Sequence, residues 1–451
     1  MQVWKMVIFN TPRVLREILP VATKMIISAL SSPDEEQTTT AARALGDLGQ
    51  KLGDRVFPQV LPLLREGLRS ENERMRLGAC EGLSELIQTA TKLQLVEHAS
   101  DLLPGVEEAL SDNSESVRSA SAKIFSYLSR PLGHPASEGV VQNLILRAAE
   151  YQEVSGYEDI RDENYALDGL QKVLALSSGK VLSSVVTNVI AEIPITDTGL
   201  MSLAAAARVA EGTFEAHLKE VMAALSQTFV RLRHESPEKL DDSVISVFSS
   251  VAASGETLTK ALLIEILSPM SHDVEMRVAG ARMLGLFVKA LGENAGDYAG
   301  TILEAAVRQL ADVDSGAVVE AWRALDILSK VVPIARLRNE VVQLRQSLRQ
   351  AGANSTYRPT DNMPGDRIEG LCIKQGPAPL VPILNEGLLH GSPELREQSA
   401  LCIAELVELS EQKALSPFVI KLTGPLIRVI SDRGPWQVKA AILHAMLRLL
   451  E

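Results

Sequence analysis

Apolar residues recur along the chain at the spacing of an amphipathic helix, at positions i, i+3, i+4 and i+7. The stripe is plain in Ala41, Leu45 and Leu48, and again in Leu83 and Leu86. Each apolar helix is followed by a short polar turn rich in Ser, Asp, Pro or Glu, and then by a second helix with Ala at helical spacing. The pattern predicts paired helices and no convincing strand.

This helix–turn–helix pattern repeats along the chain. The turns begin at Leu30, Leu68, Leu110, Leu267, Leu310, Leu389 and Ile430. Neighbouring turns lie about 38 to 43 residues apart, and the two longer gaps correspond to four and two periods of about 39 residues, which is the period of HEAT repeats. The chain is therefore predicted to be all-α, a HEAT-repeat alpha-solenoid of about eleven helical hairpins. Both ends fall inside amphipathic helices, so we expect a fragment of a longer array.

Two segments depart from the pattern. The hairpins weaken between 150 and 213, where residues 151–162 are acidic and contain Gly. The pattern breaks after Arg349, and the breaking residues are Asn354, Pro359, Asn362, Pro364, Gly365, Gly376, Pro377 and Pro379. No continuous helix fits such a segment, so we expect an irregular, mobile loop over 351–379. The predicted domains are a HEAT-repeat array over 1–350, this loop, and C-terminal HEAT repeats over 380–451.

Composition narrows the function. Of 451 residues, 46% are hydrophobic but only 4% aromatic, which is unusual for a globular enzyme of this size and suits thin layers of helices. A net charge of −12 argues against broad binding to nucleic acid. Three unpaired cysteines, Cys80, Cys372 and Cys402, indicate a reducing compartment. With no signal peptide and no apolar run long enough to cross a bilayer, we expect a cytoplasmic protein away from membranes.

No group of residues suggests catalysis. The seven histidines are scattered at no metal-ligand spacing, no cysteine pair fits a zinc site, and no glycine-rich phosphate loop follows a strand. We therefore expect no enzyme, no cofactor and no metal, but a scaffold that binds other proteins. Trp322 and Trp436 lie in apolar helical frames and are expected in the core.

Arginine recurs near the start of the second helices. These residues are Arg43, Arg76, Arg118, Arg277 and Arg396. We expect most of them to pair with an Asp or Glu of the adjacent turn and so to form a ladder between hairpins, while a minority could contact a partner.

A second arginine group follows Lys330. It comprises Arg336, Arg338, Arg345 and Arg349, and only Glu340 opposes it nearby in the sequence. Arg338, Arg345 and Arg349 fall close to one helical face. The group predicts either a solvated face or a site for an acidic protein surface or ribosomal RNA, in which case nucleic-acid contact would be minor.

Several segments go beyond general HEAT character. They are residues 10–20, 41–53, 66–70, 380–387, 423–428 and 432–441. Together they resemble the C-terminal part of the general-control translational activator, a ribosome-associated HEAT protein that activates the amino-acid-starvation kinase of initiation factor 2. The resemblance implies that residues within about 75–451 bind the RWD domain of that kinase and competing RWD-domain proteins. In the family an arginine late in this region is important for RWD binding, and position along the array favours Arg277, with Arg282 nearby.

The expected function is thus a non-catalytic scaffold whose concave surface holds an RWD domain and promotes kinase activation on ribosomes in the starvation response. The predicted partner-binding residues are Arg277, Arg282, Arg338, Arg345 and Arg349. The alternative is another HEAT class, a nuclear-transport receptor or a phosphatase scaffold subunit. A transport receptor would bind basic signals along acidic inner helices, but the starts of the inner helices carry Arg at least as often as Glu.

Overall fold

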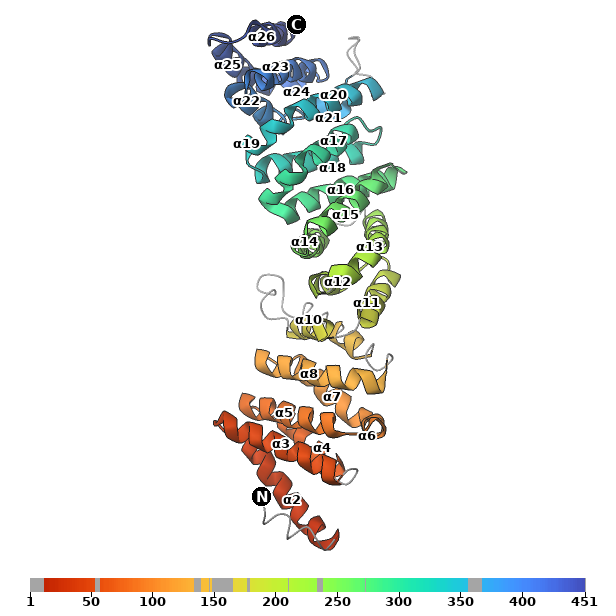
Figure 1. Cartoon of the computed structure of the whole chain (residues 1–451). Helices are drawn as coiled ribbons and strands as arrows, with labels where there is room; N and C mark the ends of the chain where they lie inside the picture. Colours follow the sequence, from red (N-terminus) through yellow and green to blue (C-terminus); the bar gives the residue numbers. More distant parts are fainter. Residues whose placement is uncertain are drawn as a thin grey trace. The chain divides into compact units, whose positions relative to one another are not determined.

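The structure is a computed structural model (Figure 1). It describes residues 12–52, 57–133, 139–145, 147, 165–176, 179–209, 211–232, 238–271, 273–355 and 367–450. These residues form α-helices and short 3-10 helices, with no strand among them. They group into two compact units, Met1–Ala191 with Asp197–His217, and Glu192–Thr196 with Leu218–Glu451. The predicted acidic segment 151–162 lies outside the described residues.

The first unit is a series of helical hairpins. Its helices are α2 (Pro12–Leu30), α3 (Glu35–Leu52), α4 (Phe57–Leu68), α5 (Glu73–Thr89), α6 (Lys92–Glu97), α7 (Ala99–Leu110), α8 (Glu115–Leu132), residues 139–145, α10 (Tyr165–Leu176), α11 (Gly179–Ala191) and α12 (Asp197–Val209). The first and second helices pack in pairs, as α2 with α3, α4 with α5 and α7 with α8. The second helices α3, α5, α8, α10 and α12 pack on one another in a row.

The second unit continues the same arrangement. Its elements are α13 (Glu211–Arg231, from Leu218 onward), α14 (Glu238–Ala253), α15 (Glu256–Leu267), η2 (Ser268–Ser271), α16 (Val274–Leu291), η3 (Gly292–Tyr298), α17 (Ala299–Gln309), α18 (Ser315–Val331), α19 (Ile334–Leu337), η4 (Arg338–Glu340), α20 (Val341–Asn354), α21 (Glu369–Cys372), α22 (Val381–His390), α23 (Pro393–Glu408), α24 (Gln412–Leu415), η5 (Ser416–Phe418), α25 (Val419–Ile430) and α26 (Trp436–Leu450). The second helices α14, α16 and α18 pack in a row, and so do α23 and α26. The predicted all-α HEAT-repeat fold is confirmed, and the described residues accommodate about eleven helix pairs.

Polar caps and aliphatic stripes explain why these segments form hairpins. The side chains of Asn72, Asp273, Asp314 and Ser392 accept backbone N–H groups at the starts of α5, α16, α18 and α23. Each cap thus satisfies donors that a helix start leaves unpaired and fixes where the second helix begins. Of the predicted stripe residues, Ala41 and Leu83 are buried and Leu45 and Leu86 completely so, whereas Leu48 is half-buried.

One hairpin of the second unit is reduced. Its first helix is the run α19–η4–α20, and its second helix is the single turn α21. Ile368 and Leu371 are fully buried, and the amides of Ile368 and Gly370 donate to the carbonyls of Leu409 and Leu310 at 3.1 and 2.9 Å. Because α21 is so short, α20 packs directly against α23.

The expected irregular loop over 351–379 begins too early and includes the single turn of α21. Residues 351–354 belong to α20, while 367–380 form α21 and a series of turns held by tertiary hydrogen bonds. Local sequence could not reveal those bonds, because their acceptors lie in neighbouring hairpins. Residues 356–366 lie outside the described residues, and the whole segment falls inside the second compact unit.

Candidate protein-binding surface

The arginine ladder exists, and its register is set by the helix caps. At the ladder position, the backbone amide donates to the carbonyl of the cap residue. Arg76 bonds Asp112 through two nitrogens, at 2.7 and 3.0 Å, and Arg277 bonds Asp312 with the same two distances. Each pair joins a second helix to the turn of the next hairpin, as predicted.

The other ladder members vary this contact. Arg396 lies 3.9 Å from Asp432 and also donates to two carbonyls of its own turn. Arg118 is buried, donates to Asp168 of α10 at 2.5 Å and lies over the ring of Tyr165. Its carboxylate partner therefore lies in a helix and not in a turn, while a second nitrogen donates to the Asp112 carbonyl of its own turn at 2.6 Å. Planar guanidinium groups suit both arrangements because they donate in a fixed fork.

Arg43 is not a ladder residue, so that part of the prediction is wrong. The ladder position of α3 is Thr38, whose amide donates to Asp34 and whose hydroxyl donates to the Ser32 carbonyl at 3.3 Å. Arg43 lies more than a turn further along α3 and is exposed. The sequence pattern located an arginine near the start of the helix. It could not show which residue caps the helix, and the ladder position is counted from that residue.

Arg277 and Arg282 share α16 but face different neighbours. Arg277 reaches forward to Asp312, whose side chain is only 8% exposed, and this hydrogen bond raises the pKa of Arg277. Arg282 reaches back to Asp241 of α14 at 2.9 Å and stacks over the ring of Phe229. The structure thus does not bring these two predicted residues into one patch.

The arginines after Lys330 hold the reduced hairpin between its neighbours. Arg336 pairs with Asp297 at 2.6 Å, toward the preceding hairpin. Arg338 approaches Glu386 of α22 at 3.4 Å, toward the following hairpin. Asp297 and Glu386 are distant from these arginines in sequence. The sequence around the arginines therefore showed only Glu340 as a nearby acid.

Arg345 and Arg349 converge on one carboxylate of α23. Arg345 donates to Glu405 at 2.9 Å and to Gln398 at 2.6 Å, and its side chain is 18% exposed. Arg349 lies 3.6 Å from the same Glu405 but is 66% exposed. Two cations thus share one carboxylate, and the outer cation keeps its head in solvent. Of the five predicted arginines, Arg349 has the most exposed side chain.

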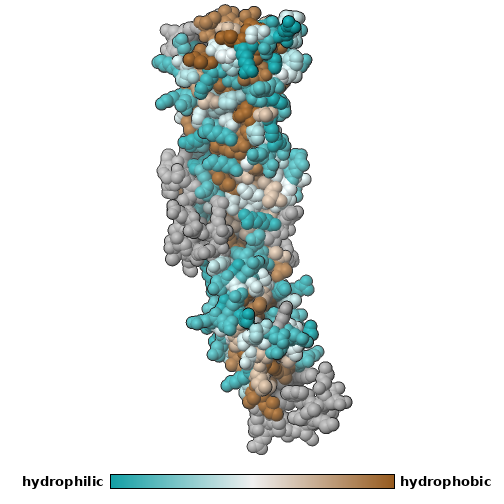
Figure 2. Space-filling view, turned by 90° about the vertical axis from the view of Figure 1, so that its left-hand side faces the viewer, coloured by the Kyte–Doolittle hydropathy of each residue, from teal (hydrophilic) through white to brown (hydrophobic). Residues whose placement is uncertain are grey.

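Trp436 lies at the surface, contrary to expectation. It is 74% exposed, together with Ile420, Ile427, Leu443 and Leu447 of the last hairpin. Figure 2 shows apolar surface gathered there, at the upper end of the view. Helical periodicity identifies such a stripe but cannot say whether a neighbour covers it. Trp322, also expected in the core, is only half-buried, and its Nε1 donates to the Gly376 carbonyl at 3.1 Å.

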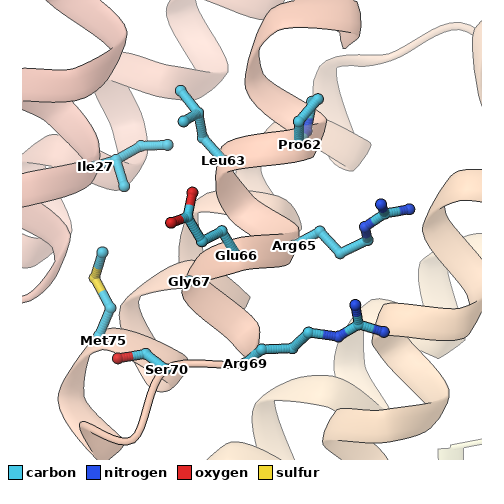
Figure 3. A pocket seen from close by; sticks show the side chains of 9 residues that line it. All are labelled: Ile27, Pro62, Leu63, Arg65, Glu66, Gly67, Arg69, Ser70 and Met75. Atoms are coloured by element: carbon cyan, nitrogen blue, oxygen red, sulfur yellow. The ribbon is translucent and has the colours of Figure 1, made fainter.

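A hollow of about 630 Å³ opens beside α4 in the first unit (Figure 3). It is lined by Ile27, Pro62, Leu63, Arg65, Glu66, Gly67, Arg69, Ser70 and Met75. Figure 3 shows Arg65 and Arg69 extending on one side of α4, and Glu66 on the other. Arg69 is already paired with Glu108 at 2.8 Å. The lining mixes both charges with aliphatics and brings no nucleophile and base together.

Groups that could do chemistry are few in the described part of the chain. Its residues contain no cluster of three or more His, Cys, Asp or Glu that could hold a metal ion. Burial raises the pKa of Cys80 and of Cys372 to about 12 and also raises that of Cys402, so none of these thiols ionises near neutral pH. No helix in the described ranges has the length and apolarity to span a bilayer.

Stacked hairpins, cap-set ion pairs and charged surfaces define a HEAT-repeat protein. A family model described as stalled ribosome sensor GCN1-like, HEAT repeats, matches residues 181–375, and a general HEAT-repeat model matches 23–123. The chain is 32% identical to human "Stalled ribosome sensor GCN1" over 100% of its length. It is 33% identical to "eIF-2-alpha kinase activator GCN1" of Dictyostelium discoideum over 99%, and 30% identical to the Saccharomyces cerevisiae protein of that name over 98%. The chain therefore belongs to the GCN1-like HEAT-repeat family.

The chain spans 16% of the length of each of these relatives. Among solved structures, Kap121p bound to Nup53p has a TM-score of 0.34 at 12% identity, covering 95% of this chain and 49% of Kap121p. The Pds5–Scc1 complex gives 0.39 at 13% identity, covering 92% of this chain and 60% of that one. Such scores carry no argument about function, so they lend no weight to the alternative of a transport receptor or phosphatase scaffold.

Proposed function

We propose that this chain is a non-catalytic scaffold that binds the RWD domain of the starvation-activated kinase of initiation factor 2, and competing RWD-domain proteins. The observation that carries the proposal is the match over nearly the whole chain to relatives named eIF-2-alpha kinase activator. By holding the kinase on cytoplasmic ribosomes, the scaffold raises its effective concentration near the activating ligand without performing chemistry.

Arg349 is the proposed primary contact. Its guanidinium is largely exposed. Glu405 carries one negative charge and is shared with Arg345, so the two arginines together leave one positive charge unbalanced. Arginine is favoured at interface hot spots because it combines charge, planar donors and an apolar stem. Arg345 and Arg338 position α20 through their bonds to the next hairpin. Arg277 and Arg282 on α16 remain a second proposed contact, although each already bonds an aspartate.

Calorimetric titration of the chain with the purified RWD domain of the kinase tests this. We expect micromolar binding that weakens about tenfold in Arg349→Ala, as for a hot-spot arginine. The matched control is Arg69→Ala, because Arg69 is similarly exposed and also paired with a glutamate, but lies in the first unit. Its affinity should equal that of the unaltered chain.

Other outcomes would relocate or remove the site. Loss of binding in Arg277→Ala, with Arg349→Ala unaffected and both variants folded by circular dichroism, would move the contact to α16. A wild-type chain that melts cooperatively but does not bind the RWD domain would contradict the proposed function.

A further inference from the structure

Two neighbouring second helices of the second unit carry cations at matching positions. Counted from their aspartate caps, Arg282 in α16 and Arg323 in α18 occupy the same place. Lys289 and Lys330 are likewise equivalent, about two turns further along each helix. Residues about two turns apart lie on the same side of a helix, so each helix presents its pair of cations on one face.

The two helices approach each other closely. A Cβ at Gly285 of α16 would lie 3.6 Å from the Cα of Ala324 and 3.5 Å from Cδ1 of Ile327, both in α18. Helices packed this tightly have axes about 8–10 Å apart. Two turns of helix add about 10 Å along the axis. The four cations thus mark the corners of a patch about 10 Å on a side, which we call the α16/α18 array.

Three of the four cations in the array are exposed. The fourth, Arg282, is 21% exposed and paired with Asp241 of α14, which is also 21% exposed. Arg323 is 58% exposed and pairs at 2.6 Å with Glu320, which is 16% exposed. Lys330 is 71% exposed and pairs at 2.6 Å with Asp326, which is 25% exposed. Lys289 is exposed and forms no ion pair with any described residue. A partner approaching this face meets positive heads first, because the acids lie beneath them.

We propose that the α16/α18 array docks an acidic helix of a partner protein, with carboxylates about two turns apart on one face. Such carboxylates repeat at the spacing of the cations along each helix. Charge complementarity of this kind steers association and selects the partner. The recessed acids disfavour a continuous phosphate backbone, as does the net charge of −12. The array is distinct from Arg349 but shares Arg282 with the second proposed RWD contact. Its test therefore changes only Lys289 and Lys330, which belong to neither proposed RWD contact.

The test uses a fluorescein-labelled, alanine-based helical peptide with glutamates seven residues apart on one face. Fluorescence anisotropy at low salt measures its affinity for the chain and for the double variant Lys289→Glu/Lys330→Glu. An isomer with the same composition, but glutamates spread around the helix, serves as a second peptide. We expect the double variant to bind the one-faced peptide at least about tenfold more weakly, and the isomer to bind the unaltered chain more weakly.

The chain offers a matched control. On α8, Lys123 and Arg130 occupy the same places after the cap Ser114 and are exposed, but the corresponding residues of the adjacent α5 are Glu81 and Gln88. Lys123→Glu/Arg130→Glu changes the net charge by the same amount without touching the array. Its affinity should stay within about twofold of the unaltered chain, because surface charge at a distance is screened.

Three results would overturn the inference. The first is an equal loss in both double variants, which would mean attraction to net charge alone. The second is an unaltered chain that ignores the one-faced peptide or prefers the isomer. The third is tighter binding of a single-stranded RNA of equal charge, which would make the surface a phosphate-binding one. Circular dichroism melts of both variants verify that each remains folded.

Discussion

Gly78 lies directly against the carbonyl oxygen of Leu30, so closely that a Cβ at residue 78 would be 2.0 Å from that oxygen. The same contact joins Gly169 to Leu110, also at 2.0 Å. Leu30 and Leu110 each end a first helix, and the glycines lie in second helices of later hairpins. Hairpin stacking in the first unit thus relies on glycine at the point where a turn meets the next second helix.

Replacing Gly78 by Ala should therefore destabilise the chain. The methyl group cannot be accommodated unless the backbone of α2 or α5 shifts, and such overpacking typically costs about 1–3 kcal/mol. Chemical denaturation followed by circular dichroism measures the change. Gly424→Ala is the control, since nothing lies within 4 Å of a Cβ there, and alanine is the better helix former. Equal stability of the Gly78→Ala and wild-type chains would contradict the contact.

Removing one partner of the ladder pair Arg277–Asp312 should cost more than removing both. Arg277→Ala leaves the carboxylate of Asp312 largely buried without its guanidinium, and uncompensated charges of this kind are strongly destabilising. We expect the free energy of unfolding to fall by about 1–3 kcal/mol, less than for a fully buried pair because Arg277 is partly exposed. The double variant Arg277→Ala/Asp312→Ala should recover part of this stability. A double-mutant cycle on unfolding free energies measures the coupling. If the losses of unfolding free energy in the two single variants add up to the loss in the double variant, the two side chains are not coupled.

The arginine ladder is interrupted at Val318. Its amide donates to the cap Asp314, so it occupies the ladder position of α18, yet its side chain is buried. The next hairpin is the reduced one, whose second helix is the single turn α21. Val318→Arg should lower the melting temperature sharply, because it places a charged side chain where the valine is buried. Thr38→Arg, at the partly buried ladder position of α3, should cost much less. If Thr38→Arg lowered the melting temperature more than Val318→Arg, the assignment of these two residues to the ladder position would be wrong.

These contacts also show how far sequence alone reaches. Periodicity predicts the helices, the hairpins and the HEAT class, because each helix buries one stripe whose spacing is local. The same logic misplaced Arg43 and treated Arg345 as free of acids, since Glu405 lies on another hairpin. The exposure of Trp436 depends equally on what covers its helix. Tertiary partners, and not periodicity, decide which arginine is available to bind.

The carboxyl group of Glu369 supplies a test by pH. It sits in α21, and partial burial together with the nearby charges of Asp312 and Asp314 raises its pKa above the ordinary value. The folded chain therefore holds this proton more tightly than the unfolded chain does. Stability from this group is fully present below the unfolded pKa and is lost as pH rises through the folded value.

Glu369→Gln should consequently melt at a higher temperature than the unaltered chain at pH 7. The advantage should shrink as the pH falls toward about 4, the ordinary pKa of a glutamate, because both side chains are then neutral. Glu394→Gln is the control, since hydrogen bonds at the α23 start lower the pKa of Glu394 and its removal should be neutral or unfavourable at pH 7. Thermal melts of the three chains across this range make the measurement. If the difference in melting temperature between Glu369→Gln and the unaltered chain did not change with pH, it would arise from packing and not from the charge of Glu369.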